Sequence, residues 1–473
     1  MLQGRIAVLD VGKTLAKLTI WSADGRLEDR HVRPNARAVS DDGYPCLDVA
    51  GIDAWLAETL RAVTEKGQLS AIVPVGHGAA ACIVDGDTLR LAPLDYEAEL
   101  PAETRAAYLA QRDSFARTGS PALPAGLNLG AQLHWLEAIA PQKARSGVIL
   151  TWPQFWAWRL CGVVAAEITS LGCHTDLWLP VEGCPSPMAV ARGWAGRLAP
   201  LRRAADGLGP VTEEWQKRGG LRENCMVLCG LHDSNAALLA ARGHAETRGR
   251  DCTVLSTGTW FVAMHSAAAR TKLDLSSFPE ARDCLVNVDV HGNPVPSARF
   301  MGGREAEILE QAAAAPIDPK ACEAALLDLA RRMVERGVMA LPAFQKGVGP
   351  FPESEGRWTD RPADQMARRA VAGLYLALMA DTSLALIGST DSLVIEGRFA
   401  DDPVFTRALA SLRPRQNIYL SHAHDSVPYG ALRLIDPDLP PHAALLRTSP
   451  LPFDLSFYTA QWRSRTLTTD TIV

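Results

Sequence analysis

The start of the chain alternates short apolar runs with small polar turns. Residues 5–9 form an apolar run that ends at Asp10, and Gly12 follows at once. Residues 16–21 resume an extended pattern, and Ala23-Asp24-Gly25 then turns the chain. Apolar runs separated by glycine-containing turns predict strands joined by hairpins. The chain therefore opens with an antiparallel meander. A dinucleotide-binding fold would open with a strand, a glycine loop and a helix, and its G-x-G-x-x-G fingerprint is absent.

The rest of the first half mixes strand-like and helix-like patterns. The predicted elements are a strand at 70–75, helices at 129–139 and 153–160, a strand at 227–228 and a helix at 236–241. The first of these strands ends in Gly76-His77-Gly78, and the last strand reaches its helix through a polar turn at 230–235. Polar residues at strand ends are typical of sites in α/β proteins, so both turns are candidates for function.

The opening pattern returns in the second half of the chain. Residues 254–258 repeat the form of residues 8–12, a strand followed by a small polar turn with glycine. This is an internal repeat of domain size, and it predicts two similar domains, residues 1–243 and 244–473. The second is predicted to contain a strand at 260–264, a helix at 362–386, a strand at 392–395, a helix at 403–412 and a proline-rich tail beyond 434 that packs on the surface.

Composition narrows the function classes. The 473 residues suit two domains of roughly 200 residues each. The net charge is −5 and no long basic run occurs, which argues against a nucleic-acid partner. No apolar stretch of about 18 residues and no secretion signal are present, so we expect a cytoplasmic protein without a membrane partner. The ten cysteines are scattered and form no paired metal-ligand pattern, so free buried thiols are expected.

The first turn, Asp10-Val11-Gly12-Lys13-Thr14, could hold a phosphate group. Its last three residues imitate the end of a Walker loop, but Ala7 stands where that motif requires glycine. A hairpin turn can still bind phosphate through backbone N–H groups and a hydroxyl, and Asp10 could hold Mg²⁺ directly or through water. On this motif alone an ordinary hairpin with a turn aspartate is the favoured interpretation.

A second turn with matching chemistry strengthens the phosphate hypothesis. Ser256, Thr257, Gly258 and Thr259 place three hydroxyls around one glycine, between two apolar runs. A γ-phosphate needs several N–H and O–H donors, and a glycine lets the backbone approach it closely. One such turn is also an ordinary polar β-turn. Two of them, one in each half, could clamp a triphosphate from both sides of a cleft.

The polar turn at 230–235 supplies a third candidate. Asp233 stands where a helix is predicted to begin, so it is either the N-cap of that helix or a catalytic base. As a base it would accept the proton of an attacking sugar hydroxyl, and an aspartate of ordinary pKa can do so in phosphoryl transfer. His232 beside it either binds substrate or packs in the core.

The order of these motifs resembles that of the FGGY carbohydrate kinases. Beside the turns already described, the resemblance covers Glu396-Gly397-Arg398, the helix at 153–160 and the segment Glu167-Ile168-Thr169-Ser170, and it extends from residue 5 to about 434. It implies the actin-like fold of sugar kinases and Hsp70-type ATPases, which is ribonuclease H-like. That fold has two α/β domains with mixed five-stranded sheets and a cleft between them. It also implies an ATP-dependent kinase that uses ATP and Mg²⁺.

The resemblance assigns roles by position. It implies Asp233 as the catalytic base and Asp10 as the metal-associated acid. It implies phosphate binding by Gly12, Lys13, Thr14, Ser256, Thr257, Gly258 and Thr259, and nucleotide binding by Gly302, Gly303, Gly397, Arg398 and Asp402. The chain departs from the family at two of these positions. Lys13 stands where threonine or serine is usual, and Arg398 replaces the second glycine of a doubled pair, which puts nucleotide affinity in question.

The sugar site is predicted on the first-domain side of the cleft. The resemblance implies substrate contacts from His77, Asp95, Tyr96, Gln132, Trp135, His232 and Asp233. The segment 170–178 is similar to the fuculose and rhamnulose kinase branch, which indicates a small-molecule ketose or deoxyketose such as L-fuculose or L-rhamnulose. Two alternatives remain open, a catalytically weak sugar-binding or regulatory relative and an ATPase of this fold that acts on proteins. A homodimer is compatible with the family.

Overall fold

The predicted meander forms one side of a seven-stranded mixed sheet. The computed structural model describes residues 4–467 apart from 270–272, 312–320, 424 and 442. The first sheet has the order β14-β15-β6-β1-β2-β3, with β16 also paired to β6. β1, β2 and β3 are antiparallel, whereas β15 and β16 run parallel to β6, which runs parallel to β1. Its strands are β1 (Arg5–Val11), β2 (Leu15–Trp21), β3 (Leu27–Pro34), β6 (Leu69–Gly76), β14 (Gly207–Pro210), β15 (Met226–Leu228) and β16 (Leu231–His232).

The second half repeats this arrangement in a sheet of the order β19-β20-β18-β17-β23-β24-β25. β17 pairs antiparallel with β18 and parallel with β23, as β1 does with β2 and β6. The strands are β17 (Cys252–Thr257), β18 (Phe261–Ser266), β19 (Cys284–Val288), β20 (Pro294–Phe300), β23 (Ser392–Gly397), β24 (Asn417–Ser421) and β25 (Leu446–Arg447). The predicted α/β fold of two similar units with mixed sheets is therefore confirmed. Five strands were expected in each sheet. Additional strands bring each sheet to seven.

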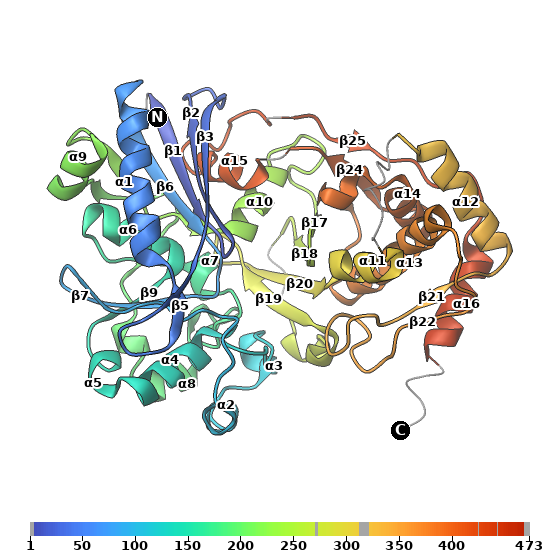
Figure 1. Ribbon diagram of the computed structural model, residues 1–473, viewed down its shortest axis with the longest axis horizontal. Helices are drawn as coiled ribbons and strands as arrows, with labels where there is room; N and C mark the ends of the chain where they lie inside the picture. The colour runs from blue at the N-terminus through green and yellow to red at the C-terminus, as the bar shows by residue number, and fades with distance from the viewer. Residues whose placement is uncertain (1–3, 270–272, 312–320, 424, 442, 468–473) are drawn as a thin grey trace.

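The two sheets form two lobes, the first on the left and the second on the right in Figure 1. Alternate residues of β1 pack on opposite faces of its sheet. Ala7, Leu9 and Val11 belong to the core that includes α1 (Val49–Glu65) and α6 (Trp152–Cys161), whereas Ile6 and Val8 belong to the core that includes α10 (Asp233–Ala241) and α15 (Ser426–Leu432). In the second lobe, one face of the sheet packs on α11 (Gly302–Glu310), α12 (Glu323–Glu335), α13 (Gln365–Leu386), α14 (Pro403–Leu412) and α16 (Ser456–Leu467).

Two helices, α10 and α15, connect the lobes. α10 belongs to the first half of the chain, yet its Leu238 and Ala241 pack in the core of the second sheet. α15 belongs to the second half, yet its Tyr429 and Leu432 pack on the first sheet. The helices cross so closely that a Cβ atom on Gly430 would lie 1.8 Å from the carbonyl oxygen of Ala236. The predicted boundary at 243/244 lies in the loop between α10 and β17.

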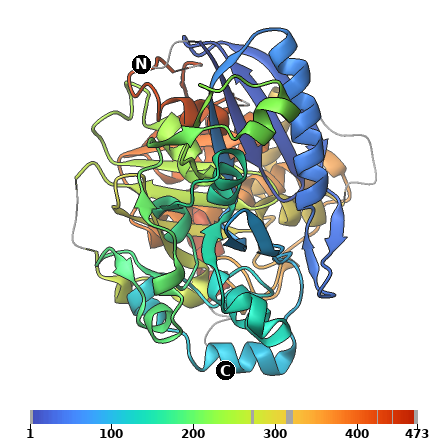
Figure 2. The same cartoon turned by 90° about the vertical axis from the view of Figure 1, so that its left-hand side faces the viewer.

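A smaller three-stranded sheet extends the first lobe below its main sheet (Figures 1 and 2). It consists of β7 (Ala81–Asp85), β8 (Thr88–Leu91) and β9 (Val148–Thr151), and α2 (Ala102–Leu109) and α4 (Leu129–Ile139) share its core. The remaining short elements are β4 (Arg37–Val39), β5 (Pro45–Leu47), α3 (Phe115–Thr118), α5 (Pro141–Ala144), β10 (Ala166–Glu167), α7 (Ile168–Leu171), β11 (Trp178–Leu179), β12 (Cys184–Pro185), α8 (Pro187–Ala191), β13 (Leu201–Arg202), α9 (Glu213–Gly219), β21 (Ala340–Leu341) and β22 (Arg357–Trp358).

Two sequence predictions need correction or comment. The C-terminal tail does not only pack along the surface, because α16 places Tyr458 and Trp462 in the core of the second lobe. The Trp462 ring N–H also donates to the carbonyl of Ala340. α13 is long and apolar enough to cross a membrane by length and composition, but 83% of its most apolar window is buried inside the protein. Its apolar composition therefore serves packing. All ten cysteines are free thiols, as predicted, and seven are buried, but Cys184 is exposed and Cys161 and Cys322 are half-buried.

Candidate active site

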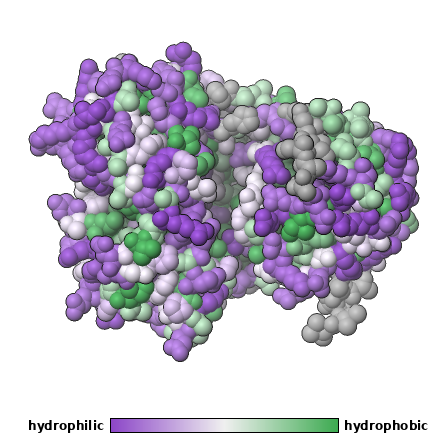
Figure 3. Space-filling view, viewed as in Figure 1, coloured by the Kyte–Doolittle hydropathy of each residue, from purple (hydrophilic) through white to green (hydrophobic). Residues whose placement is uncertain are grey.

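The two predicted phosphate turns occupy corresponding places in the two lobes. The first joins β1 to β2 and is closed by a hydrogen bond from the Gly12 N–H to the carbonyl of Leu15 (3.0 Å). The second joins β17 to β18 and is closed by a hydrogen bond from the Gly258 N–H to the carbonyl of Trp260 (3.0 Å). Each turn follows the strand that lies at the centre of its sheet. Figure 3 shows that the surface is hollowed between the lobes.

Asp10, at the end of β1, is a buried acid beside the first turn. It is 7% exposed, and burial raises its pKa to about 6, with a further contribution from the negative charge of Asp233. Lys17 opposes this shift, since its Nζ lies 3.4 Å from Asp10 Oδ2. The pairing is set by the hairpin, which places Asp10 directly opposite Lys17 in the β1–β2 register. Sequence reasoning missed Lys17, although its place in an antiparallel hairpin opposite Asp10 was a usable signal.

Asp233 lies next to the same site from the other side of β6. The short strand β16 pairs His232 with Gly76 of β6, and α10 starts at Asp233. The N-cap position belongs to His232, and no side chain caps the helix, so the alternative of Asp233 as an N-cap is wrong. Burial raises the pKa of Asp233 to about 6, although 30% of its side-chain surface is exposed to solvent.

The two carboxylate oxygens of Asp233 have different surroundings. Oδ1 accepts hydrogen bonds from Ser234 N (2.5 Å) and Ser234 Oγ (3.2 Å), and His232 Nε2 lies 3.2 Å away. Oδ2 has no partner among the residues that the structure describes, and it is not a buried atom. Hydrogen bonds also hold the backbone of residues 229–232. The His232 N–H donates to Thr169 Oγ1, and Gln154 Nε2 donates to the carbonyls of Cys229 and Gly230. One oxygen is thus fixed by hydrogen bonds, and the other is unpaired.

Three aromatic rings surround the predicted sugar loop. His77 packs against Tyr96 and Trp152, with ring centroids 5.2 and 6.0 Å apart. Its Nδ1 accepts a hydrogen bond from the Ala79 N–H (3.3 Å), so Nε2 carries the proton, and that N–H is buried without a partner among the described residues. Burial is the main reason why the pKa of His77 falls to about 3, so the ring is neutral at pH 7. An orphaned buried donor of this kind is what a sugar oxygen would satisfy.

Lys13 links the first phosphate turn to the predicted sugar segment. Its ammonium forms an ion pair with Asp95, lies 3.9 Å from Glu97 Oε2 and stands 5.1 Å from the centre of the Tyr96 ring. Lys13, Asp95 and Trp152 also line a small cavity of about 190 Å³ that includes Gly12 and Thr14. The unusual lysine of the turn is therefore neutralised within the first lobe, as an ion pair that spans 82 residues of sequence.

Gln132 and Trp135 have structural roles in α4. Gln132 is fully buried, and its amide donates to the carbonyls of Ala79 and Gly126 and accepts from the Ala81 N–H. It therefore holds the loop that carries His77. Trp135 packs against the core of the small sheet. These contacts give both side chains a structural role, and the sugar contacts implied by the family resemblance stay a prediction.

The predicted nucleotide residues gather behind the second turn. A Cβ atom on Gly303 would lie 2.1 Å from the carbonyl oxygen of Gly258, and one on Gly397 would lie 2.4 Å from that of Thr257. Both glycines therefore allow close backbone packing on the turn, and Gly397 also has a φ of +87°. Glu396, before Gly397, accepts a hydrogen bond from Ser256 Oγ (2.5 Å), and burial raises its pKa. Sequence reasoning did not single out Glu396 as a support of this turn.

Arg398 and Asp402 face in different directions. The Arg398 guanidinium stacks over the Phe399 ring at 4.9 Å and lies 3.7 Å from Glu307, with more than half of the side chain exposed. Asp402 is buried, and it caps α14 by accepting from the N–H groups of Val404 and Phe405 (both 3.0 Å). Its other oxygen accepts from Arg369. These bonds commit Asp402 to the core of the second lobe.

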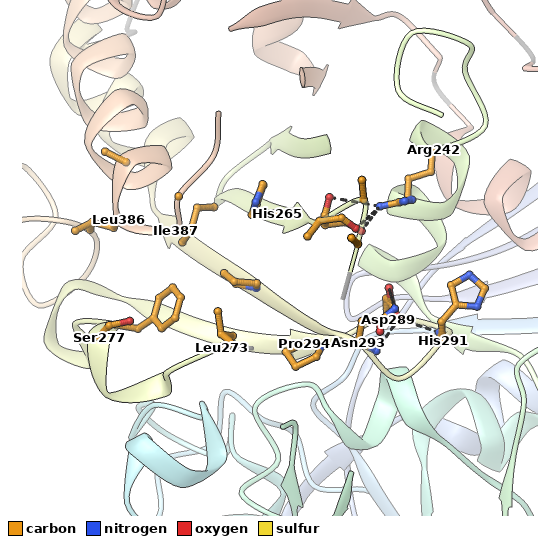
Figure 4. Close-up of a pocket in the computed structure, with 18 residues that line it drawn as sticks. Arg242, His265, Leu273, Ser277, Asp289, His291, Asn293, Pro294, Leu386 and Ile387 are labelled. Atoms are coloured by element: carbon orange, nitrogen blue, oxygen red, sulfur yellow. Dashed lines mark hydrogen bonds between the residues drawn. The ribbon is translucent and has the colours of Figure 1, made fainter. Parts of the chain in front are cut away.

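A separate cavity of about 480 Å³ lies elsewhere in the second lobe (Figure 4). Its walls include Arg242, His265 and Asn293, and Arg242 donates to Ser266 Oγ there. None of the predicted site residues lines it. The cavity is therefore distinct from the two turns and from Asp233.

Comparisons with known proteins agree with this geometry. Residues 249–443 match the model of the carbohydrate kinase FGGY C-terminal domain. The crystal structure of a carbohydrate kinase from Novosphingobium aromaticivorans is 50% identical, with a TM-score of 0.93, and the match covers 97% of this chain and 100% of that one. No curated protein matches the chain at a significant level.

More distant structures share the fold. A xylulose kinase from Rhodospirillum rubrum is 17% identical with a TM-score of 0.77, and the match covers 99% of this chain and 98% of that one. A gluconate kinase from Lactobacillus acidophilus is 13% identical with a TM-score of 0.78, covering 99% and 97%. These two support the two-lobed fold alone, whereas the 50% identical kinase and the matched domain show the family. The chain belongs to the FGGY carbohydrate kinases and is a sugar kinase.

Proposed function

We propose that this kinase transfers the γ-phosphoryl group of ATP to a hydroxyl of a ketose, with Asp233 as the general base. The observation that carries the proposal is the asymmetry of the Asp233 carboxylate. Oδ1 is held by Ser234 and faces His232, whereas Oδ2 is free. A base must be fixed in orientation and still present one unpaired oxygen to the proton that it takes.

The transfer needs little covalent chemistry from the protein. The sugar hydroxyl gives its proton to Asp233 Oδ2 while its oxygen bonds to the γ-phosphorus, and the bond to the β-phosphate oxygen breaks to release ADP. A pKa of about 6 leaves Asp233 ionised at pH 7 and still makes it a better proton acceptor than an exposed aspartate. Positioning and charge stabilisation supply most of the rate in such reactions.

The phosphate groups are proposed to bind between the two turns. Gly12, Lys13 and Thr14 on one side, and Ser256, Thr257, Gly258 and Thr259 on the other, are proposed to line this site. The N–H groups of Gly12 and Gly258 close their turns, and the hydroxyls of Ser256 and Thr257 donate to Glu396, so the hydroxyls of Thr14 and Thr259 are the proposed O–H donors. Lys17 is a further proposed phosphate contact. Its Nζ lies 3.4 Å from Asp10 Oδ2, and its charge lowers the pKa of Asp233. Gly302, Gly303, Gly397 and Arg398 remain proposed nucleotide contacts. Asp402 is proposed to support this region from the core.

Asp10 fits a magnesium site of the kind that keeps waters and phosphate oxygens as ligands. Mg²⁺ bound to a nucleotide commonly takes one or two carboxylates from the protein. The raised pKa of Asp10 reflects its burial and the negative charge of the Asp233 carboxylate, which a cation would offset. Among the described residues no cluster of three or more metal-ligating side chains occurs, which agrees with a metal held largely by phosphate. The bound metal would neutralise phosphate charge.

The sugar is proposed to be a ketose or deoxyketose such as L-fuculose or L-rhamnulose, which rests on the resemblance of residues 170–178 to that kinase branch. His77, Asp95 and Tyr96 are proposed to contact it. The distant structural neighbours are named as kinases of xylulose, gluconate and glycerol, so D-xylulose, D-gluconate and glycerol belong in any test panel.

One observation favours a second candidate, a sugar-binding relative with weak catalysis. Arg398 replaces a glycine of the nucleotide motif, and its exposed side chain lies between Phe399 and Glu307. If it blocked the adenine, the protein would bind sugar without turnover. Calorimetric titration with ATP separates the two candidates, because the kinase must bind ATP.

The test is sugar-dependent ADP release from Mg-ATP, measured with each panel sugar. Asp233→Asn should lower kcat by at least roughly a hundredfold, the usual range for loss of a general base, while ATP binding is retained. Asp41→Asn, in the exposed turn between β4 and β5, is the matched control and should leave kcat unchanged. Near-normal turnover of Asp233→Asn would reject the role of this residue.

A further inference from the structure

Three neutral histidines lie close together around the proposed sugar site. His232 lies in β16, His77 directly follows β6, which pairs with β16, and His174 follows α7. Burial is the main reason why the pKa falls to about 3 for His77, to about 3 for His174 and to about 4 for His232. The segments that carry them are in contact, because a Cβ atom on Gly78 would lie 2.5 Å from Cys173 Sγ and 3.2 Å from His232 Cδ2.

The hydrogen bonds of His174 fix which of its nitrogens carries the proton. Nδ1 lies 2.9 Å from the carbonyl oxygen of Leu127, and a carbonyl can only accept, so Nδ1 is the donor. Nε2 of the neutral ring is then an acceptor. It has no hydrogen-bond partner among the described residues and is not a buried atom, so its lone pair is open to a ligand.

The backbone holds His174 in a costly conformation. Its φ of +37° lies in the left-handed region, which is uncommon for residues other than glycine, asparagine and aspartate. The carbonyl of His174 is tied by Asn128 Nδ2 (3.1 Å), and Asn128 is itself buried. Strain of this kind persists where the surroundings enforce it, and it gathers at ligand sites.

His174 also lies where the two lobes approach each other. The adjacent Cys173 Sγ is 3.4 Å from His232 Nε2, which places the segment beside the proposed base. From the second lobe, Arg299 of β20 contributes to the low pKa of His174. Arg299 is bound to Asp283 (2.8 Å) and stacks on Trp260, which follows the second phosphate turn. A Cβ atom on Gly172 would lie 2.4 Å from Val288 of β19, so the segment that carries His174 packs against the second lobe.

We propose that His174 is a specificity-determining residue whose Nε2 accepts a hydrogen bond from a second hydroxyl of the sugar. The proposal rests on the function proposed above. His77 supplies the opposite polarity, an Nε2–H donor for a sugar oxygen. The site thus distinguishes sugars by requiring a hydroxyl donor at one position and an oxygen acceptor at another.

The same contacts define the charge of the substrate. The cations closest to the sugar segment are already paired, Lys13 with Asp95, Lys17 with Asp10 and Arg299 with Asp283. A sugar acid would bring a carboxylate, which cannot donate to His174 and finds no unpaired cation among these three. The site should therefore favour a neutral sugar over a sugar acid, and D-gluconate should be a poor substrate.

The cleanest perturbation is His174→Asn. Asparagine tolerates positive φ, and its Nδ2 can keep the hydrogen bond to Leu127, so the change removes the Nε2 acceptor alone. We expect kcat/KM for the ketose to fall by roughly tenfold or more, mainly through KM, with KM for ATP unchanged. His291→Asn, in the exposed β19–β20 turn, is the matched control and should behave as wild type.

A second measurement uses the wild-type enzyme, so that the proposal can be tested even if His174→Asn folds poorly. Wild-type enzyme is assayed with D-xylulose, L-rhamnulose, L-fuculose and monodeoxy derivatives of the preferred sugar. For one deoxy derivative, kcat/KM of the wild type should fall relative to the parent sugar. For the same derivative, His174→Asn should have the same kcat/KM as the wild type, since the deoxy change and the substitution remove the same hydrogen bond. Wild-type kcat/KM that is equal for all derivatives, or additive losses, would overturn the role of His174.

The outcomes separate this proposal from the proposed function. If the wild type binds a ketose by calorimetry but shows no ADP release, the kinase function fails, and His174→Asn can still be tested by its sugar Kd. If the wild type is active and His174→Asn is unchanged, only the role of His174 fails. Turnover of D-gluconate as fast as that of the ketoses would refute the neutral substrate class, and binding of no sugar would overturn both proposals.

Discussion

Gly430→Ala tests the crossing of the two helices that connect the lobes. The added Cβ would lie 1.8 Å from the carbonyl oxygen of Ala236 and 2.5 Å from its carbonyl carbon, whereas real Cβ atoms essentially never come closer than 3.0 Å. Because the clashing atoms are backbone, no side-chain rotation can relieve them. The helices α10 and α15 must therefore move apart by about 1.2 Å, the difference between 3.0 and 1.8 Å.

This movement reaches the proposed base. Asp233 is the first residue of α10, one helical turn before Ala236. A misplacement of about 1 Å at a catalytic group costs on the order of a hundredfold in rate. Overpacking also costs about 1–3 kcal/mol of stability. We expect Gly430→Ala to lower kcat/KM by roughly a hundredfold and to lower the midpoint of urea unfolding.

The stability of Gly430→Ala also provides the opposite outcome. Alanine is favoured over glycine inside a helix by about 1 kcal/mol, so without the clash Gly430→Ala would stabilise the protein. A variant that is more stable than wild type with unchanged kcat/KM would show that the helices are not in close contact. Gly196→Ala is the control, because nothing lies within 4 Å of its added Cβ.

Three further predictions concern Asp10, Asp233 and Lys17. Because Asp233 must be ionised to act as a base and its pKa is about 6, kcat/KM should fall as the pH drops below about 6 and level off above it, measured by ADP release in buffers of constant ionic strength. The folded pKa values of Asp10 and Asp233 lie above the ordinary value of 3.8, so their contribution to stability is fully present below pH 3.8 and is lost as the pH rises through 6. A pH-independent kcat/KM between 4 and 8 would contradict the base assignment. Lys17→Met should raise KM for ATP and move the kcat/KM profile to higher pH, since Lys17 lowers the pKa of both acids. Lys66→Met, which removes an exposed partner of Asp29, is its control, and equal profiles for both variants would exclude Lys17 from the site.

The sequence by itself determined the elements that depend on near neighbours. The hairpin of Asp10 and Gly12, its repeat at Ser256–Thr259 and the turn before Asp233 are visible because strand alternation and turn residues act over a few positions. Two such hairpins in corresponding places were enough to indicate a duplicated fold. Asp233 was found with its correct neighbours but with an open choice between helix cap and base, and only the helix start at Asp233 excluded the cap.

Tertiary structure decided the contacts that join distant segments. Lys13 pairs with Asp95 across 82 residues, and nothing near Lys13 in the sequence indicates this partner. α16 folds into the second lobe although its surroundings are rich in proline, because Trp462 finds a buried site there. The accessible lone pair of His174 depends on a carbonyl 47 residues away. Hydrogen bonds and ion pairs act only at short range in space, so the residues that complete this site become visible only after the chain has brought them together.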